Sequence, residues 1–340
     1  MQAELLAHLE RIDQLVSALA ALPWLKSAEL EQARQVLLDF DAGYWPVVRT
    51  MSLPLYGELM LLLSSGEAVS LLRERPRLAV VIPLHRGRAE LLRQTLQSLR
   101  CQLGVEIECL ISIDGDPQDR QLAEALLEEL ESEAQANSWL VSLLFSDVNR
   151  GVGMCRNQAL AQLEAPFFSC LDADDVFHPL RCLHALLVLL REGLTRLNTG
   201  WCRASLFERK LVLTNDRLSY AGHNSFVARS ELLRQCGYQA DLRFFEDTEF
   251  MQRHLYYGVP TMDSPVVAHY LHTEPRADYL SLSSPCRLEV HAIPDHPYLC
   301  GSVISEPLPS WRAVYLEYQQ RYRSLSKWDL PRAFPAFPAS

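Results

Sequence analysis

The chain has 340 residues, 49% of them hydrophobic, and a formal net charge of -10 at pH 7. This composition provides enough apolar side chains for a large packed core and excludes a largely disordered chain. The negative charge disfavours nucleic acid as a partner, because binding to a phosphate backbone depends on clustered Lys and Arg.

The first 76 residues are predicted to form a helical module. Apolar residues recur at helical steps of four and three along a segment that ends before Pro23. Further helices are expected around residues 28–39 and 54–74, the second interrupted at residues 64–66, and Pro76 closes the region. Packing of this module on the rest of the chain is the simpler interpretation, and a homodimer formed through these helices is the alternative.

After Pro76, short apolar strands alternate with amphipathic helices. Strands are predicted at residues 77–84, 107–115, 139–147 and 165–171, and helices at residues 88–102, at 118–135 and from about residue 153. The alternation predicts βαβ units, a largely parallel sheet and an α/β domain over residues 77–275. In the remaining extension, 276–340, aromatic residues between Trp311 and Tyr322 are spaced as one face of a helix, which indicates packing on the domain or, alternatively, a membrane or partner contact.

The sequence shows no pattern typical of a signal peptide, a membrane-spanning segment or a zinc site. No apolar run reaches the roughly 18 to 20 residues that span a bilayer, and the N-terminus lacks the features of a signal peptide. We therefore predict a cytoplasmic protein without a transmembrane segment, with peripheral attachment to a membrane as the alternative. The nine cysteines include no C-x-x-C pair, which favours reduced buried thiols over a zinc site.

Three carboxylates follow the strand predicted at residues 165–171. Asp172, Asp174 and Asp175 lie at its carboxyl end, where ligands bind in open parallel sheets. Oxygen ligands grouped on a rigid turn suit Mg²⁺ or Mn²⁺. The alternative is a polar turn whose Asp caps the apolar helix that follows.

Two further segments carry polar residues suited to the same crevice. In residues 149–160, two glycines let the backbone approach a ligand, and Arg156 can meet a phosphate or order the acidic residues. Glu246 and Asp247 begin a helix-like stretch and point in different directions. A capped helix with two solvated acids is the alternative for that stretch.

Taken in order along the chain, these segments resemble the glycosyltransferase family 2 enzymes of the GT-A fold. The resemblance runs from about Leu78 to His272 and rests on VVIPLHRGR, SIDGD, NRGVGMCRN, SCLDADD, FFEDTEF and YLHTE. It implies a Rossmann-like, mostly parallel sheet flanked by helices, and metal-dependent, inverting transfer of a sugar from a nucleotide diphosphate sugar, most simply a UDP-sugar, to an acceptor hydroxyl. The chain has neither the Q-x-x-R-W segment of processive polysaccharide synthases nor a spanning helix, which favours transfer of a single sugar. The alternatives are a sugar nucleotidyltransferase, or a noncatalytic protein that binds nucleotide sugars or acts as a scaffold.

The resemblance also assigns roles to individual residues. Asp247 would be the catalytic base, and Glu246 would orient the site or bind the acceptor. Mn²⁺ or Mg²⁺ would be bound by Asp174 with Asp172, Asp175 and His272, and His269 competes with His272. The residues expected at the nucleotide are Pro83, Asp114, Asn149, Gly151, Arg156, Asn157, Asp172 and Ala173.

The sequence departs from the family pattern in two places. Ile113 stands where many members carry the first of two Asp residues, so Asp114 alone is left to accept a hydrogen bond from the base. The segment PLHRGR replaces the commoner Tyr-Asn pair after the first strand. The acceptor stays open among a glycan, a lipid-linked sugar, a protein and a small molecule.

Overall fold

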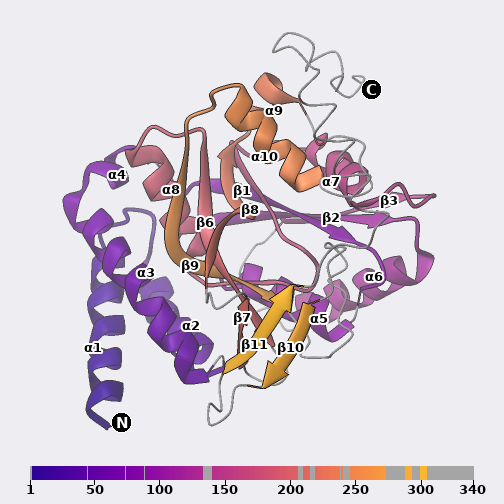
Figure 1. Cartoon of the computed structure of the whole chain (residues 1–340). Helices are drawn as coiled ribbons and strands as arrows, with labels where there is room; N and C mark the ends of the chain where they lie inside the picture. Colours follow the sequence, from indigo (N-terminus) through magenta and orange to yellow (C-terminus); the bar gives the residue numbers. More distant parts are fainter. Residues whose placement is uncertain are drawn as a thin grey trace.

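A computed structural model describes residues 2–43, 45–72, 74–87, 89–132, 140–205, 210–214, 219–237, 239, 246–272, 288–292 and 299–304. One mixed sheet with helices packed on both faces forms the body of the molecule (Figure 1). The helix predicted between Trp311 and Tyr322 lies outside the described residues.

The N-terminal module consists of helices α1 (Gln2–Leu19), α2 (Ser27–Gly43), α3 (Trp45–Ser65) and α4 (Glu67–Ser70). The prediction that the third helix starts at residue 54 is wrong, because α3 continues through Pro54. Proline keeps a helical φ and sacrifices one backbone hydrogen bond. Buried apolar residues follow it, Leu55, Leu59 and Leu62 among them, so packing holds the helix together at this point.

These helices pack on the rest of the chain, as the simpler interpretation expected. Ile12, Leu37 and Leu59 belong to one continuous buried cluster that also contains residues of β1 (Arg77–Leu84) and α8 (Arg181–Arg191). In Figure 1, α1–α4 lie together on the side of the molecule that carries α8. The domain boundaries and the homodimer stay predictions.

The first half of the sheet is parallel and follows the predicted alternation closely. Its strands are β1, β2 (Glu106–Asp114), β3 (Leu140–Ser146) and β4 (Phe167–Cys170), in the spatial order β4-β1-β2-β3. The intervening helices are α5 (Ala89–Arg100), α6 (Pro117–Ser132) and α7 (Val152–Leu160). This half confirms the predicted α/β fold, with the carboxyl ends of the parallel strands at one edge.

The second half makes the sheet mixed rather than mostly parallel. Its elements are β5 (Val176–Phe177), α8, β6 (Arg196–Ser205), β7 (Lys210–Thr214), β8 (Tyr220–Arg229), α9 (Glu231–Cys236), α10 (Glu246–Tyr256), β9 (Thr261–His272), β10 (Leu288–Ala292) and β11 (Leu299–Ile304). Strand β8 runs antiparallel to β4 and β6, and β9 runs parallel to β6 and antiparallel to β5. Among the residues that the structure describes between β6 and β7 and between β7 and β8, no helix is present that would act as a crossover between parallel strands.

The side chains of β1 point alternately to the two faces of the sheet, and both faces are covered by helices. Leu78, Val80 and Ile82 point into the cluster shared with α5, α8 and the N-terminal helices, whereas Ala79 and Val81 point into a second cluster with α7, α9 and α10. A strand buried on both sides must be apolar at every position. Within the described residues, none of the helices combines the length and apolar character needed to span a bilayer.

Candidate active site

The three acidic residues form a turn between β4 and β5. The Asp175 backbone N–H donates to the Asp172 carbonyl oxygen at 3.1 Å. The Asp172 side chain is 23% exposed and Asp174 is half-buried, whereas Asp175 is buried. Helix α8 begins only at Arg181 and has no side-chain cap, so the interpretation of these carboxylates as its N-cap is wrong.

Asp175 anchors the turn to β9. One carboxylate oxygen accepts the His272 backbone N–H at 3.0 Å, and the other lies 3.1 Å from Nε2 of the buried His269. Burial raises the pKa of the Asp175 carboxyl, and the charges of Asp174 and Asp172 raise it further. Both oxygens are therefore engaged within the protein, which differs from the predicted role of Asp175 as a metal ligand.

Arg156 provides the positive charge that the acidic turn requires. Its guanidinium, 3% exposed, donates from Nη2 to Asp172 Oδ1 at 2.6 Å and from Nη1 to Glu246 Oε1 at 2.9 Å. Burial lowers the pKa of Arg156, but the carboxylates of Asp172 and Glu246 outweigh burial and raise it. Arg156 thus joins the end of β4 to the start of α10, where the sequence allowed either this role or contact with a phosphate.

Glu246 and Asp247 stand at the N-terminus of α10. Glu246 is buried, and burial raises the pKa of its carboxyl to about 7, against the opposing effect of Arg156 and with a contribution from the charge of Asp247. Asp247 is half-buried. The two carboxylates therefore lie in different environments, which agrees with the prediction that adjacent residues of a helix point in different directions.

A small cavity brings Asp247 and Asp172 together. It has a volume of about 10 Å³, close to what one water molecule needs. Its lining residues are Arg156, Cys170, Asp172, Phe226, Gln239, Asp247 and Phe250. The side-chain oxygen of Gln239, a residue that the sequence analysis did not select, is buried without a hydrogen-bond partner in the described part of the chain. The predicted base and the predicted donor-binding turn thus border one space.

Asp114, at the end of β2, holds the loop after β3. Its two carboxylate oxygens accept the backbone N–H groups of Arg150 at 2.7 Å and Gly151 at 2.9 Å. Gly115 has φ 76°, and a Cβ there would lie 2.4 Å from the Asn149 nitrogen, so only glycine permits this close approach. The sequence predicted Asp114 as a contact of the base and did not predict its contacts with the loop.

The other predicted nucleotide residues are divided between open and structural positions. The Asn157 side chain exchanges two hydrogen bonds with the Gln239 backbone, at 2.8 and 2.9 Å, and is buried. Pro83, Gly151 and Ala173 are half-buried at the same edge, and Asn149 is exposed. Asn157 therefore holds the segment that carries Gln239.

A cleft of about 260 Å³ opens beside Asp114. It is lined by Asp114, Phe145, Ser146, Asp147, Val148, Arg150, Met154, Cys155 and Gln158. It combines one aromatic ring with carboxylates, hydroxyl and amide groups and one guanidinium. That mixture of an apolar wall with a few polar groups is typical of a small-ligand site.

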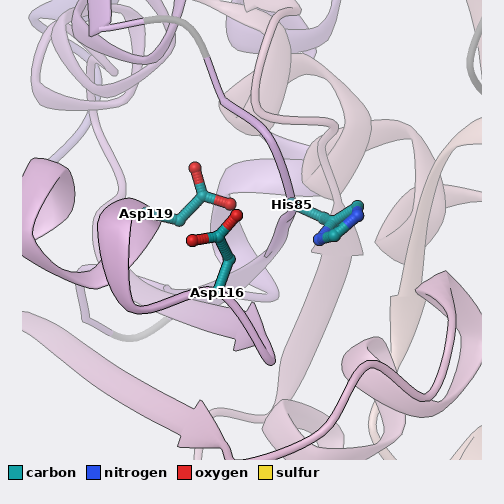
Figure 2. A group of neighbouring side chains, drawn as sticks. All are labelled: His85, Asp116 and Asp119. Carbon is teal, nitrogen blue, oxygen red and sulfur yellow. The ribbon is translucent and has the colours of Figure 1, made fainter.

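A second group of possible metal ligands was not predicted from the sequence. His85, Asp116 and Asp119 place one ligand atom each within 4.8 Å of one another (Figure 2). Asp119 accepts the backbone N–H groups of Arg86 at 2.5 Å and Gly87 at 2.9 Å, and Arg86 has a positive φ of 52°. These hydrogen bonds give Asp119 a structural role in fixing the loop after β1.

The predicted metal ligands are more widely spread. Among the described residues, Asp172, Asp174, Asp175 and His272 do not place three ligand atoms within 4.8 Å of one another. The reason is visible in the contacts, because Asp172 is drawn to Arg156 and Asp175 to β9. Asp172 and Asp174 remain as two carboxylates with access to solvent, which suits a hard cation that completes its shell with water and phosphate oxygens.

Comparison with known families identifies the central part of the chain. Residues 79–243 match the family model described as Glycosyl transferase family 2. These residues form a glycosyl transferase family 2 domain. The match confirms the predicted family for this part of the chain. No curated protein matches the chain.

Solved structures give weaker likenesses to this chain. The S. aureus TarS 1-349 fragment in complex with UDP-GlcNAc is 20% identical, with a TM-score of 0.49, and the match covers 61% of each chain. A mannosyltransferase from Pyrobaculum calidifontis, in complex with GDP-Man and Mn2+, is 15% identical with a TM-score of 0.46, and the match covers 67% of each chain. This chain therefore matches about three fifths of the length of the TarS fragment.

Proposed function

We propose that the family 2 domain transfers a single sugar from a nucleotide diphosphate sugar to an acceptor hydroxyl, with a divalent cation and with inversion at the anomeric carbon. The observation that supports this most is the bridge formed by Arg156. It joins Asp172, after β4, to Glu246 at the start of α10, and the neighbouring Asp247 lines the same cavity as Asp172. Asp247 would thus lie close to a donor bound at the turn, where it could accept the proton of the acceptor hydroxyl.

The nucleotide would lie along the carboxyl edge of β1, β2 and β4. The cleft beside Asp114 has room and polar groups for a base, and we favour a UDP-sugar. Asp114 would act chiefly through the loop at Arg150 and Gly151, which it holds by two hydrogen bonds. Pro83, Asn149 and Ala173 would border the donor from the same edge.

Mn²⁺ or Mg²⁺ would be held by Asp174 together with Asp172. These carboxylates suit a cation that takes one or two protein oxygens and completes its shell with substrate phosphates. When bound, the cation would stabilise the charge that develops on the leaving diphosphate. Asp175 would hold the turn in place through His272 and His269.

Asp247 would accept the proton of the acceptor hydroxyl. Glu246, tied to Arg156 at 2.9 Å, would fix the start of α10 and hence the position of Asp247. A single displacement places the base and the leaving group on opposite faces of the anomeric carbon, so the product linkage is inverted. A positioned base of this kind is worth about 10²–10⁴ in rate.

The test compares Asp247→Asn with the parent and with Glu128→Gln, an exposed control on α6. A panel of nucleotide sugars is first screened for thermal stabilisation with Mn²⁺, because a ligand that binds the folded state raises its stability. With the donor so identified, Asp247→Asn should retain binding by calorimetry while transfer falls by roughly two to four orders of magnitude. NMR of the product should show an inverted anomeric configuration.

Three results would contradict parts of this proposal. Parent-like turnover by Asp247→Asn would exclude it as the base, and a product with retained configuration would exclude single displacement. A parent that binds nucleotide sugar but transfers it neither to an acceptor nor to water would favour the scaffold alternative. The cytoplasmic location stays a prediction, and the acceptor stays open among a glycan, a lipid-linked sugar, a protein and a small molecule.

A further inference from the structure

One buried carboxylate ties the three long N-terminal helices together. Asp41, on α2 and 2% exposed, lies 2.7 Å from Nε2 of His8 on α1. The Tyr56 hydroxyl on α3 donates to the same carboxylate oxygen, Oδ2, at 2.9 Å. Burial raises the pKa of Tyr56, and the charge of Asp41 raises it further, so the phenol keeps its proton and its donor role.

This cluster reaches the family 2 domain at His178. The Tyr56 oxygen lies 3.4 Å from Nε2 of His178. Nδ1 of the same ring accepts the Leu180 backbone N–H at 3.1 Å, so in the neutral ring the proton is on Nε2. Burial lowers the pKa of His178 to about 4, which keeps the ring neutral near pH 7. The hydrogen bonds therefore run from His178 to Tyr56 and from Tyr56 to Asp41.

His178 lies at the end of the segment that begins with the acidic turn. Between them is β5, whose Val176 and Phe177 pair with Tyr270 and His269 of β9. The His178 backbone N–H donates to the Ala268 carbonyl oxygen at 2.9 Å. Asp175 is held by that same strand, so one stretch of β9 fixes both ends of the segment.

Helix α2 adds an apolar contact at the same place. The Phe40 ring packs edge-on against His178, with ring centroids 4.7 Å apart, and is tilted against Tyr270 of β9 at 5.9 Å. Phe40 and Asp41 are adjacent, so one turn of α2 supplies both the apolar contact and the carboxylate. In Figure 1 the N-terminal helices lie alongside α8 and β9. The helical module thus contacts the segment that carries the acidic turn through specific polar groups as well as through core packing.

We propose that Tyr56, held by Asp41, is a positioning residue that fixes the acidic turn for donor binding through His178. The proposal rests on the proposed function of Asp172 and Asp174 as the donor-binding carboxylates. The family match begins at residue 79, so this role belongs to a part of the chain outside it. In this arrangement the N-terminal module is a structural component of the donor site, although it contributes no group to the reaction.

The experiment uses the full chain and the variant Tyr56→Phe. This change removes one hydroxyl and leaves the ring, so His178 and Asp41 each lose a partner while the core keeps its volume. Ile12→Val is the control, because it trims a fully buried side chain of α1 without touching the hydrogen bonds. Asp41→Asn is a second variant on the same network and should act in the same direction.

Two measurements test whether Tyr56 fixes the acidic turn. Hydrogen exchange of the His178 and His272 amides should become roughly three- to tenfold faster in Tyr56→Phe, the factor expected for about one net hydrogen bond, and stay near the parent rate in Ile12→Val. Calorimetry with UDP and Mn²⁺ should show binding weaker by a similar factor in Tyr56→Phe only.

Each other outcome has a definite meaning. Unchanged exchange in Tyr56→Phe, or equal acceleration in Ile12→Val, would overturn the proposal whether or not any nucleotide binds. Faster exchange with unchanged UDP affinity would also overturn it, because the turn would then move without consequence for the donor. A parent that fails to bind UDP, and fails with every other nucleoside diphosphate tried, would instead overturn the proposed function, and the exchange rates would still decide whether Tyr56 fixes the turn.

Discussion

Replacing Arg156 by Met should be among the most destabilising changes in the described site. The substitution keeps an unbranched side chain but removes a guanidinium that is 3% exposed and donates at 2.6 and 2.9 Å to two carboxylates. Two hydrogen bonds to charged groups contribute about 1.5–3 kcal/mol each. Breaking a buried ion pair by removing one partner costs about 3–5 kcal/mol. Because Asp172 retains access to water, we expect a loss of about 3–4 kcal/mol in the free energy of unfolding.

The pH dependence gives this prediction a distinctive signature. Without Arg156, Glu246 loses the charge that favours its ionised form, so its folded-state pKa rises further. Protonation of the carboxyl then removes the uncompensated charge. The variant should therefore lose less of the free energy of unfolding, relative to the parent, at pH 5.5 than at pH 8. Urea unfolding followed by circular dichroism at both pH values measures this. For a slope of about 2 kcal/mol/M, the midpoint at pH 8 should fall by roughly 1.5–2 M.

Arg34→Met is the matched control for that experiment. Arg34 also pairs with a carboxylate, Asp13, at 2.7 Å, but both side chains are about half exposed. Water screens such a pair, so the urea midpoint should stay within error of the parent value. The reasoning would be refuted if Arg156→Met behaved like this control, or if its deficit were the same at both pH values.

Three further changes test other parts of the site. Gly115→Ala should lower the free energy of unfolding by about 2 kcal/mol or more, because φ is 76° and the new Cβ would lie 2.4 Å from the Asn149 nitrogen. The control Gly193→Ala should cost less, because Gly193 also has a positive φ, 63°, but open space around its Cβ position. Equal urea midpoints for the two variants would contradict the argument. Glu246 has a pKa raised from 4.5 to about 7, so the folded state binds its proton more tightly than the unfolded state does. The contribution of Glu246 to the free energy of unfolding therefore falls by about 3 kcal/mol as pH rises from about 4.5 to 7. Glu246→Gln should remove that fall, and an unchanged pH profile of unfolding would be evidence against the shift. Asp174→Ala should abolish Mn²⁺-dependent binding of the donor identified by the nucleotide-sugar screen with little change in melting temperature, and equal affinity with EDTA and with Mn²⁺ in the parent would defeat the metal proposal.

Local sequence pattern was sufficient for the parallel half of the fold. Strand β1 runs over Arg77–Leu84, as its apolar run predicted, and α5 and β2 begin and end within two residues of the predicted bounds. These elements are governed by hydrophobic period and by turn residues, which are properties of neighbouring positions. Sequence pattern failed at Pro54, where buried residues in the following turns keep α3 intact, and in the second half of the sheet, where pairing depends on distant strands.

The chemical character of the site was also readable from the sequence, but the partners of its charges were not. The order of the acidic turn, the Arg156 segment and the Glu246-Asp247 pair indicated glycosyltransferase family 2, and residues 79–243 match that family. The alternation of strands and helices predicted that Asp114 and the acidic turn would lie at strand carboxyl ends, along one edge of a sheet. Three pairings became known from the folded structure alone: Arg156 bridges Asp172 and Glu246, Asp114 holds a loop, and Asp175 binds β9. A carboxylate takes whichever donors the packed fold brings within about 3 Å, and those donors come from elements far apart in the chain, so no local pattern encodes the pairing.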